Sequence, residues 1–185
     1  MPSNKLLEVK FSARAGQGAK TAAQIVAEAG LKNNFFVQAF PQYGPERRGA
    51  PVSTFVRLST SPILTHAQIK KPDIVAVIEP GLEEYPEASV KVINTKEASV
   101  DSSKTWLLDA TQIAEFFLGR NLPNIVMVGA LLKVIESIYP VYEIPIESAS
   151  ETIRESLGEK WGEELVSKNI SALEAGYKEV KQDEN

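Results

Sequence analysis

Apolar residues recur along this chain at two spacings, and the two spacings alternate. Residues 6–11 and 35–40 form short apolar runs that predict strands, whereas residues 20–31 between them carry apolar positions at helical spacing. Gly16 and Gly18 follow the first run directly, so a glycine turn separates the first strand from the helix. A strand, a glycine turn, a helix and a second strand are the opening unit of an α/β sheet.

The rest of the chain continues this alternation. Residues 52–58 alternate apolar and polar and predict a strand, and residues 63–65 are expected to return as a short hairpin strand. Continuous apolar runs at 73–78, 89–94 and 105–108 are typical of strands buried on both faces. Helices are predicted over 111–118, 124–139, 147–157 and 160–180, followed by a frayed tail at 181–185.

These elements predict an α/β fold: a three-layer, Rossmann-like domain with a largely parallel (mixed) central sheet flanked by helices. The chain has no internal repeat or low-complexity stretch, so residues 1–185 are expected to form a single domain. The predicted helix at 124–139 is apolar on most of its circumference. One face would cover the sheet, and the other would lie either in the core of this domain or against a partner subunit.

The glycine turn has the chemistry of an anion site. Gly16 and Gly18 permit positive φ and close approach of a ligand, and the helix behind them presents unpaired N–H groups. Lys20 and Arg14 add positive charge, which suits a phosphate or a carboxylate. The turn lacks the third glycine of the dinucleotide fingerprint, because Thr21 stands there, and it lacks the Gly-Lys-Ser/Thr of a phosphate loop. A tight strand-to-helix connection that needs glycine is the alternative.

A second loop, residues 41–51, follows the second strand and is also basic. Tyr43, Arg47, Arg48 and Gly49 lie within it, and arginine pairs bind phosphates through two parallel hydrogen bonds. Alternatively, Glu46 pairs with one of the arginines and the loop is merely solvated. If the first two strands are parallel, both loops emerge at their carboxyl ends, where open α/β sheets bind ligands.

Composition excludes several classes of protein. The chain has no cysteine and one histidine, His66, so it holds no thiolate metal site, no iron–sulfur cluster and no histidine cluster, and we predict neither a metal site nor catalytic residues. A net charge of −4 argues against nucleic-acid binding. No apolar run approaches the roughly 18 residues of a membrane span, and the first ten residues lack the apolar core of a signal peptide. We therefore expect a cytoplasmic protein that does not contact a membrane.

Three motifs occur in order: G-Q-G-x-x-T-A-A at 16–23, P-x-Y-G-P-E-x-R-G at 41–49 and V-R-L-S-x-x-P-I at 56–63. Together with Leu122-Pro123-Asn124 and the Val-Gly-Ala-Leu of 128–131, they resemble the gamma subunits of 2-oxoacid:ferredoxin oxidoreductases, most closely those of pyruvate:ferredoxin oxidoreductases (pyruvate synthases). The resemblance spans residues 6–180. One departure is Ala15, since many members have a second glycine there, and it suggests that this position does not need a glycine-only conformation.

The resemblance implies a subunit of an assembly that oxidatively decarboxylates a 2-oxoacid, here pyruvate, to acetyl-CoA and passes the electrons to ferredoxin or flavodoxin. The resemblance also implies that thiamine diphosphate, Mg²⁺ and iron–sulfur clusters belong mainly to the alpha, beta and delta subunits, and the absence of cysteine and of a thiamine motif from this chain agrees with that. The subunit would be inactive alone and would contact coenzyme A and help to close the active site. The residues expected to do so are Gly16, Gln17, Gly18, Lys20, Thr21, Tyr43, Arg47, Arg48 and Gly49.

Three alternatives remain open. The two loops could instead be docking surfaces of a purely structural subunit, with Arg47 and Arg48 pairing carboxylates of a partner. The 2-oxoacid could be 2-oxoglutarate or a branched-chain acid. A stand-alone nucleotide-binding module is disfavoured, because the second strand ends in Ala39-Phe40-Pro41 rather than in an acidic residue.

Overall fold

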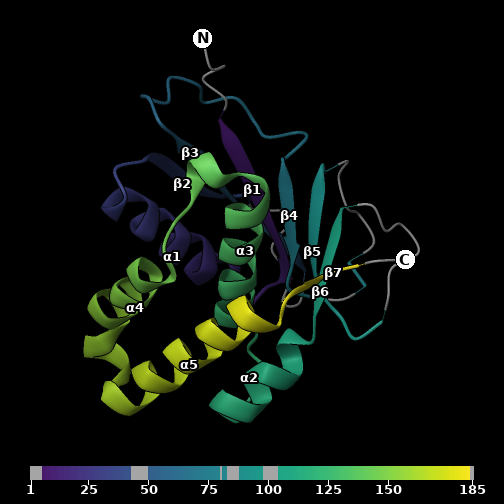
Figure 1. Cartoon of the computed structure of the whole chain (residues 1–185), viewed down its shortest axis with the longest axis vertical. Helices are drawn as coiled ribbons and strands as arrows, with labels where there is room; N and C mark the ends of the chain where they lie inside the picture. Colours follow the sequence, from purple (N-terminus) through teal and green to yellow (C-terminus); the bar gives the residue numbers. More distant parts are fainter. Residues whose placement is uncertain (1–5, 43–49, 80, 83–87, 98–103, 184–185) are drawn as a thin grey trace.

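The computed structural model describes residues 6–42, 50–79, 81–82, 88–97 and 104–183. Its centre is a seven-stranded sheet, in the order β2-β3-β1-β4-β5-β6-β7 (Figure 1). The strands are β1 (Leu7–Arg14), β2 (Phe36–Gln42), β3 (Pro51–Ser59), β4 (Ile74–Val77), β5 (Val90–Asn94), β6 (Thr105–Leu108) and β7 (Lys181–Gln182). The pairs β1–β4, β4–β5 and β5–β6 are parallel, and the pairs toward the two edges are antiparallel. The predicted α/β class with a mixed sheet is confirmed.

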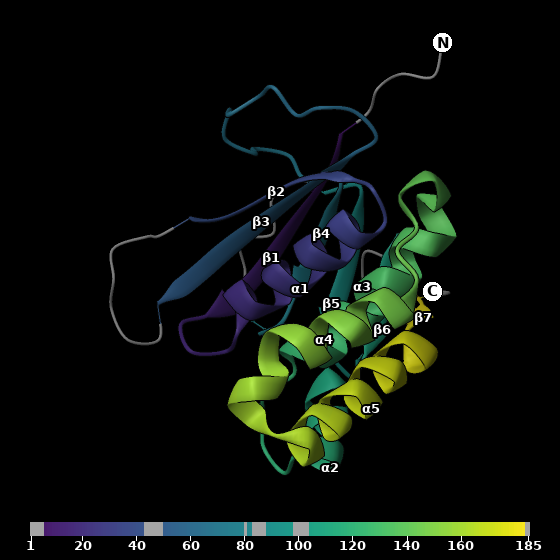
Figure 2. The same ribbon diagram turned by 90° about the vertical axis from the view of Figure 1, so that its left-hand side faces the viewer.

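The helices share one hydrophobic cluster with one face of this sheet. They are α1 (Ala19–Lys32), α2 (Ala110–Leu118), α3 (Asn124–Ile138), α4 (Ile146–Trp161) and α5 (Glu163–Glu179), with a short 3₁₀ turn, η1 (Pro140–Tyr142), between α3 and α4. Alternate residues of β1, such as Val9 and Phe11, are fully buried against them. Figure 2 shows α1 in front of the sheet and α4 and α5 on the same side. All five described helices therefore lie on one face of the sheet, the face that packs against α1, and not on both faces as the predicted three-layer arrangement would require.

Helix α3 lies at the centre of this layer, which decides between the two interpretations of its apolar surface. Eleven of its fifteen residues are buried within this chain. It contacts α5 above all, and also α1, α2, η1 and β5. Gly129 of α3 and Gly176 of α5 allow the two backbones to touch, because a Cβ on either glycine would overlap a carbonyl of the other helix. The all-round apolar helix is thus a core helix of this domain.

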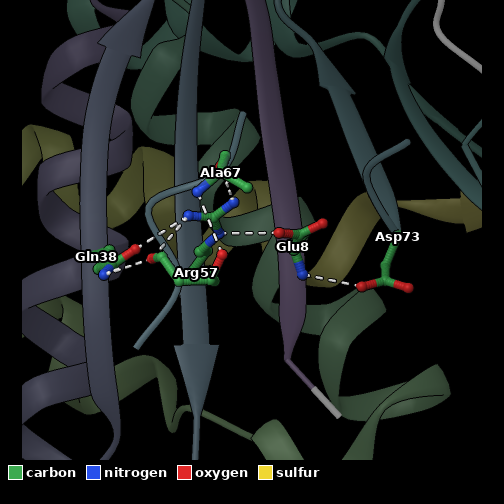
Figure 3. Close-up of polar contacts among 6 residues, drawn as sticks. Glu8, Gln38, Arg57, Ala67 and Asp73 are labelled. Atoms are coloured by element: carbon green, nitrogen blue, oxygen red, sulfur yellow. Dashed lines mark hydrogen bonds and ion pairs between the residues drawn. The ribbon is translucent and has the colours of Figure 1, made fainter. Parts of the chain in front are cut away.

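The opposite face of the sheet carries a buried arginine (Figure 3). Arg57 of β3 is 2% exposed and donates from Nε to Glu8 of β1 at 2.9 Å, and from Nη1 to Gln38 of β2 at 3.1 Å. Its guanidinium also donates to the backbone carbonyls of Thr65 and Ala67. One side chain thereby connects three neighbouring strands to the segment that follows β3.

That segment corrects one prediction. Residues 63–65 do not form a hairpin strand: the Thr65 carbonyl accepts hydrogen bonds from the side chains of Gln38 and Arg57 instead of joining a ladder of strand hydrogen bonds. A second prediction, the frayed tail at 181–185, is also corrected in part. Lys181 and Gln182 form β7 against β6, and the Asp183 N–H donates to the Thr105 carbonyl at 2.8 Å, so this part of the predicted frayed tail is an edge strand.

Candidate functional site

The glycine turn after β1 takes backbone angles that favour glycine. Gly16 has φ of 97° and Gly18 has φ of 78°, whereas Ala15 does not take a positive φ. The Gln17 N–H donates to the Arg14 carbonyl at 3.1 Å, which closes the turn. Both glycines thus adopt the positive φ that their lack of a Cβ permits, and the suggestion that position 15 does not need a glycine-only conformation is confirmed.

Helix α1 begins directly behind this turn with its N–H groups uncapped. Gly18 is its N-cap residue, and no described side chain accepts a hydrogen bond from the first turn. The backbone N–H groups of Ala19, Lys20 and Thr21 therefore have no partner within the helix. Lys20 is exposed and Thr21 is half-buried in this first turn. Such an end of a helix attracts negative charge.

The side chain of Gln17 is engaged within the site, whereas the sequence predicts only a backbone contact for this residue. Its Oε1 accepts the backbone N–H of Arg14 at 2.7 Å, and its Nε2 donates to the Glu79 carboxylate. Arg14 lies 3.4 Å from the same carboxylate, through Nε and Oε1. Glu79 follows β4 and so links the loops after two neighbouring parallel strands. Its charge offsets that of Arg14, which leaves Lys20 as the cation of the turn with no ion pair in the described part of the chain.

A second helix starts beside the first. Asn124, the first residue of α3, is 3% exposed, and its Nδ2 donates to the Gly18 carbonyl at 3.3 Å. The contact joins residues 106 positions apart in the sequence. It places the N-terminal ends of α1 and α3 next to each other at the carboxyl edge of the sheet.

The second predicted loop, with Tyr43, Arg47, Arg48 and Gly49, lies outside the described residues, whereas the residues that flank it are described. Gln42 pairs with Ser53, Pro51 pairs with Arg14, and the Ala15 N–H donates to the Ala50 carbonyl at 3.0 Å. Strands β1 and β2 point the same way because each is antiparallel to β3, which lies between them. The loop at 43–49 therefore starts and ends at the edge that carries the glycine turn.

Sequence reasoning missed two residues of this site. Glu79 follows a buried strand that becomes the neighbour of β1, and a charged residue at such a strand end was the available signal. Asn124 was noted only as part of a motif, although an amide that opens an otherwise apolar helix is itself unusual. The described residues contain no group of three or more His, Asp or Glu side chains that could hold a metal ion. None of their helices is both long and apolar enough to cross a membrane.

A mixed sheet whose first helix starts uncapped at a glycine turn, on the carboxyl edge, defines an α/β domain with unpaired helix N–H groups at that edge. The family model described as pyruvate ferredoxin/flavodoxin oxidoreductase matches residues 8–179, and the chain belongs to that family.

Individual relatives match over nearly their whole length. The pyruvate synthase subunit PorC of Thermotoga maritima is 35% identical, with 97% of each chain covered. A subunit of Thermococcus kodakarensis, named as the common gamma subunit of pyruvate and ketoisovalerate oxidoreductases, is also 35% identical and covers 93% of this chain and 96% of its own. The crystal structure of a pyruvate oxidoreductase subunit PorC from Thermotoga maritima superposes with a TM-score of 0.79 at 33% identity, over 96% of this chain and 98% of that one.

Proposed function

We propose that this chain is the gamma subunit of a pyruvate:ferredoxin oxidoreductase and that its own task is to bind coenzyme A at the glycine turn. The assembly converts pyruvate and coenzyme A to acetyl-CoA and passes electrons to ferredoxin or flavodoxin. Membership of the family and the full-length match to pyruvate synthase subunits support the assignment. Because the chain lacks cysteine, partner subunits would carry the iron–sulfur clusters. Its sequence also lacks a thiamine motif, so the alpha, beta and delta partners would carry the thiamine diphosphate and its Mg²⁺ as well.

The uncapped start of α1 is the observation that carries the local role. Coenzyme A has a diphosphate and a 3′-phosphate, and phosphates bind where a helix offers free N–H groups. The N–H groups of Ala19 to Thr21 lie at the open N-terminal end of the helix, and the exposed Lys20 is one of these residues. The loop carrying Arg47 and Arg48 is anchored to the same edge through Ala15 and Ala50, which supports a second set of phosphate contacts there.

Glu79 indicates where along this edge a phosphate would bind. A phosphate placed over Arg14 would meet the Glu79 carboxylate, since the two side chains are paired. A phosphate at the first turn of α1 instead meets Lys20 and the backbone donors. Gly16 leaves room for it, because no described heavy atom lies within 4 Å of the position that a Cβ would take there.

The test uses the assembled oxidoreductase. Replacing Arg47 and Arg48 together by alanine is expected to raise the KM for coenzyme A at least about tenfold, because each charge-assisted contact contributes about 1.5–3 kcal/mol when desolvated. Lys20→Ala is expected to raise the same KM in the same direction, by a smaller factor because Lys20 is exposed. The KM for pyruvate should change little. Lys32→Ala, at the opposite end of α1, is the matched control and should leave both constants unchanged.

A purely structural role predicts a different result. If the arginine variant fails to assemble while the residual complex binds coenzyme A normally, the basic loop is a docking surface and the proposal is wrong for that loop. The Thermococcus relative, which is named as a gamma subunit common to two oxidoreductases, bears on the identity of the 2-oxoacid. A subunit that serves two oxidoreductases does not by itself define the 2-oxoacid, so a panel of pyruvate, 2-oxoglutarate and branched-chain 2-oxoacids on the purified complex is needed to identify the substrate.

A further inference from the structure

Asn124 is a polar residue in a place that otherwise excludes polar side chains. It is 3% exposed, and the residues that follow it in the first turn of α3, Ile125, Val126 and Met127, are apolar and buried. A buried amide costs stability unless its hydrogen-bonding groups find partners. The contacts of Asn124 therefore indicate what keeps it there.

Those contacts are directed at the start of α1. Nδ2 donates to the Gly18 carbonyl at 3.3 Å, and the same carbonyl accepts the Ala22 N–H at 2.9 Å, which is the first hydrogen bond of the helix. The contact is also steric. A Cβ on Gly18 would stand 2.5 Å from Nδ2 and 2.8 Å from Cγ of Asn124. The side chain thus holds the peptide group from which α1 starts by a hydrogen bond and by direct packing.

The oxygen of the Asn124 amide differs from its nitrogen. Asn124 Oδ1 is buried without a hydrogen-bond partner among the described residues. An apolar side chain of similar size would avoid that cost, because the Gly18 carbonyl would still be satisfied by Ala22. The contacts of Asn124 thus add little to stability, but they are well suited to holding the Gly18 peptide group in one position.

We infer that Asn124 is a positioning residue of the glycine turn: it fixes the Gly18 peptide so that the first-turn N–H groups of α1 face the anionic ligand. This inference rests on the proposed function, in which that ligand is coenzyme A. It also connects the Gly-Gln-Gly and Leu-Pro-Asn motifs, which lie about a hundred residues apart and meet at this one contact. Asn124 itself touches the turn and is not assigned a contact with the ligand.

Asn124→Leu in the assembled oxidoreductase is the test. The leucine is close to asparagine in size and removes both the donor and the unpartnered acceptor. We expect the KM for coenzyme A to rise about fivefold, the effect of losing one hydrogen bond, with kcat and the KM for pyruvate unchanged. Backbone hydrogen exchange of residues 14–22 in the complex should become faster, because the start of α1 is no longer held.

Asn169→Leu is the matched control. Asn169 in α5 is 2% exposed and also donates to a backbone carbonyl, that of Leu165 at 2.7 Å, but it belongs to no part of the site. It should leave the KM for coenzyme A and the exchange of residues 14–22 unchanged. Should the leucine variant not assemble, Asn124→Ser removes the same contact with a smaller side chain, and the same rise in KM is expected.

The outcomes separate this inference from the proposed function. If Lys20→Ala raises the KM for coenzyme A and neither Asn124 variant does, the positioning role is wrong and the coenzyme A site stands. If the Asn124 and Asn169 variants have equal effects, the role of Asn124 is only structural and the inference is overturned. If neither Lys20→Ala nor the Asn124 variants change the KM, the proposed function and the inference both fail.

Discussion

Arg57 is a buried cation with several polar contacts, and it lies on the face of the sheet away from the helices. Its guanidinium binds Glu8, Gln38 and two backbone carbonyls, and it stacks over the ring of Phe40 at 5.3 Å from the centroid. Arg57→Met would leave the Glu8 carboxylate without its cation and would remove the guanidinium donor from the Ala67 carbonyl, whereas the Thr65 carbonyl would keep the donor of Gln38. We expect a loss of about 2–4 kcal/mol in the free energy of unfolding, measured with urea, since breaking a buried ion pair is costly.

Arg120→Met is the control for this change, because Arg120 is exposed after α2. It should alter the free energy of unfolding by less than about 0.5 kcal/mol. Equal effects of the two substitutions would mean that Arg57 contributes no more than a surface arginine.

At the scale of elements, the contact between α3 and α5 depends on the absence of two side chains. A Cβ on Gly129 would overlap the backbone carbonyl of Leu173, and backbone cannot move aside as a flexible side chain can. Gly129→Ala should therefore separate the helices and lower the free energy of unfolding by more than about 3 kcal/mol. Gly158→Ala in α4, where a Cβ meets no described atom within 4 Å, should be neutral or stabilising by up to about 1 kcal/mol.

The same two helices are joined by a titratable cluster. Tyr177 of α5 donates to the Glu136 carboxylate of α3, and Lys133 lies 3.1 Å from Glu136 and over the Tyr177 ring. This hydrogen bond raises the pKa of Tyr177 to about 12 and lowers the pKa of Glu136. A raised tyrosine pKa means that the folded state favours the neutral phenol.

The stabilisation from Tyr177 is therefore complete below its ordinary pKa of about 10 and is lost as pH rises toward about 12. Glu136 behaves in the opposite way: its contribution is present above the ordinary carboxyl pKa and is lost as pH falls through the lowered value. Urea unfolding above pH 10 should show a steeper loss of stability for the unmodified chain than for Tyr177→Phe. Parallel curves for the two proteins would contradict this assignment.

At the scale of the whole molecule, the chain is expected to have no oxidoreductase activity by itself. It has no cysteine for an iron–sulfur cluster, and its sequence has no thiamine motif. The measurement is pyruvate- and coenzyme A-dependent reduction of viologen by the purified subunit, with the assembled complex as the positive control. Turnover by the subunit alone that persists after traces of the assembled complex are removed would show that the chemistry does not need the partner subunits.

Most elements of the fold could be predicted from local pattern. The buried strands at 74–77, 90–94 and 105–108 are continuous apolar runs, and Gly16 and Gly18 predict the glycine turn. The candidate site was predicted only in part. Lys20 and the uncapped helix start follow from neighbouring residues, whereas Glu79 and Asn124 reach the turn from strands and helices that are remote in the sequence.

The sequence by itself determined most of the segments that are strands and helices, because hydrophobic spacing and glycine conformations act over a few residues. It also determined that this chain cannot hold iron–sulfur clusters, since that depends only on the presence of cysteine. The tertiary structure alone decided that α3 is a core helix, that residues 63–65 are tied to Arg57, and that residues 181–182 complete the sheet. Each of these depends on contacts between residues that are distant along the chain, and the free energy of such contacts is set by packing that no local pattern records.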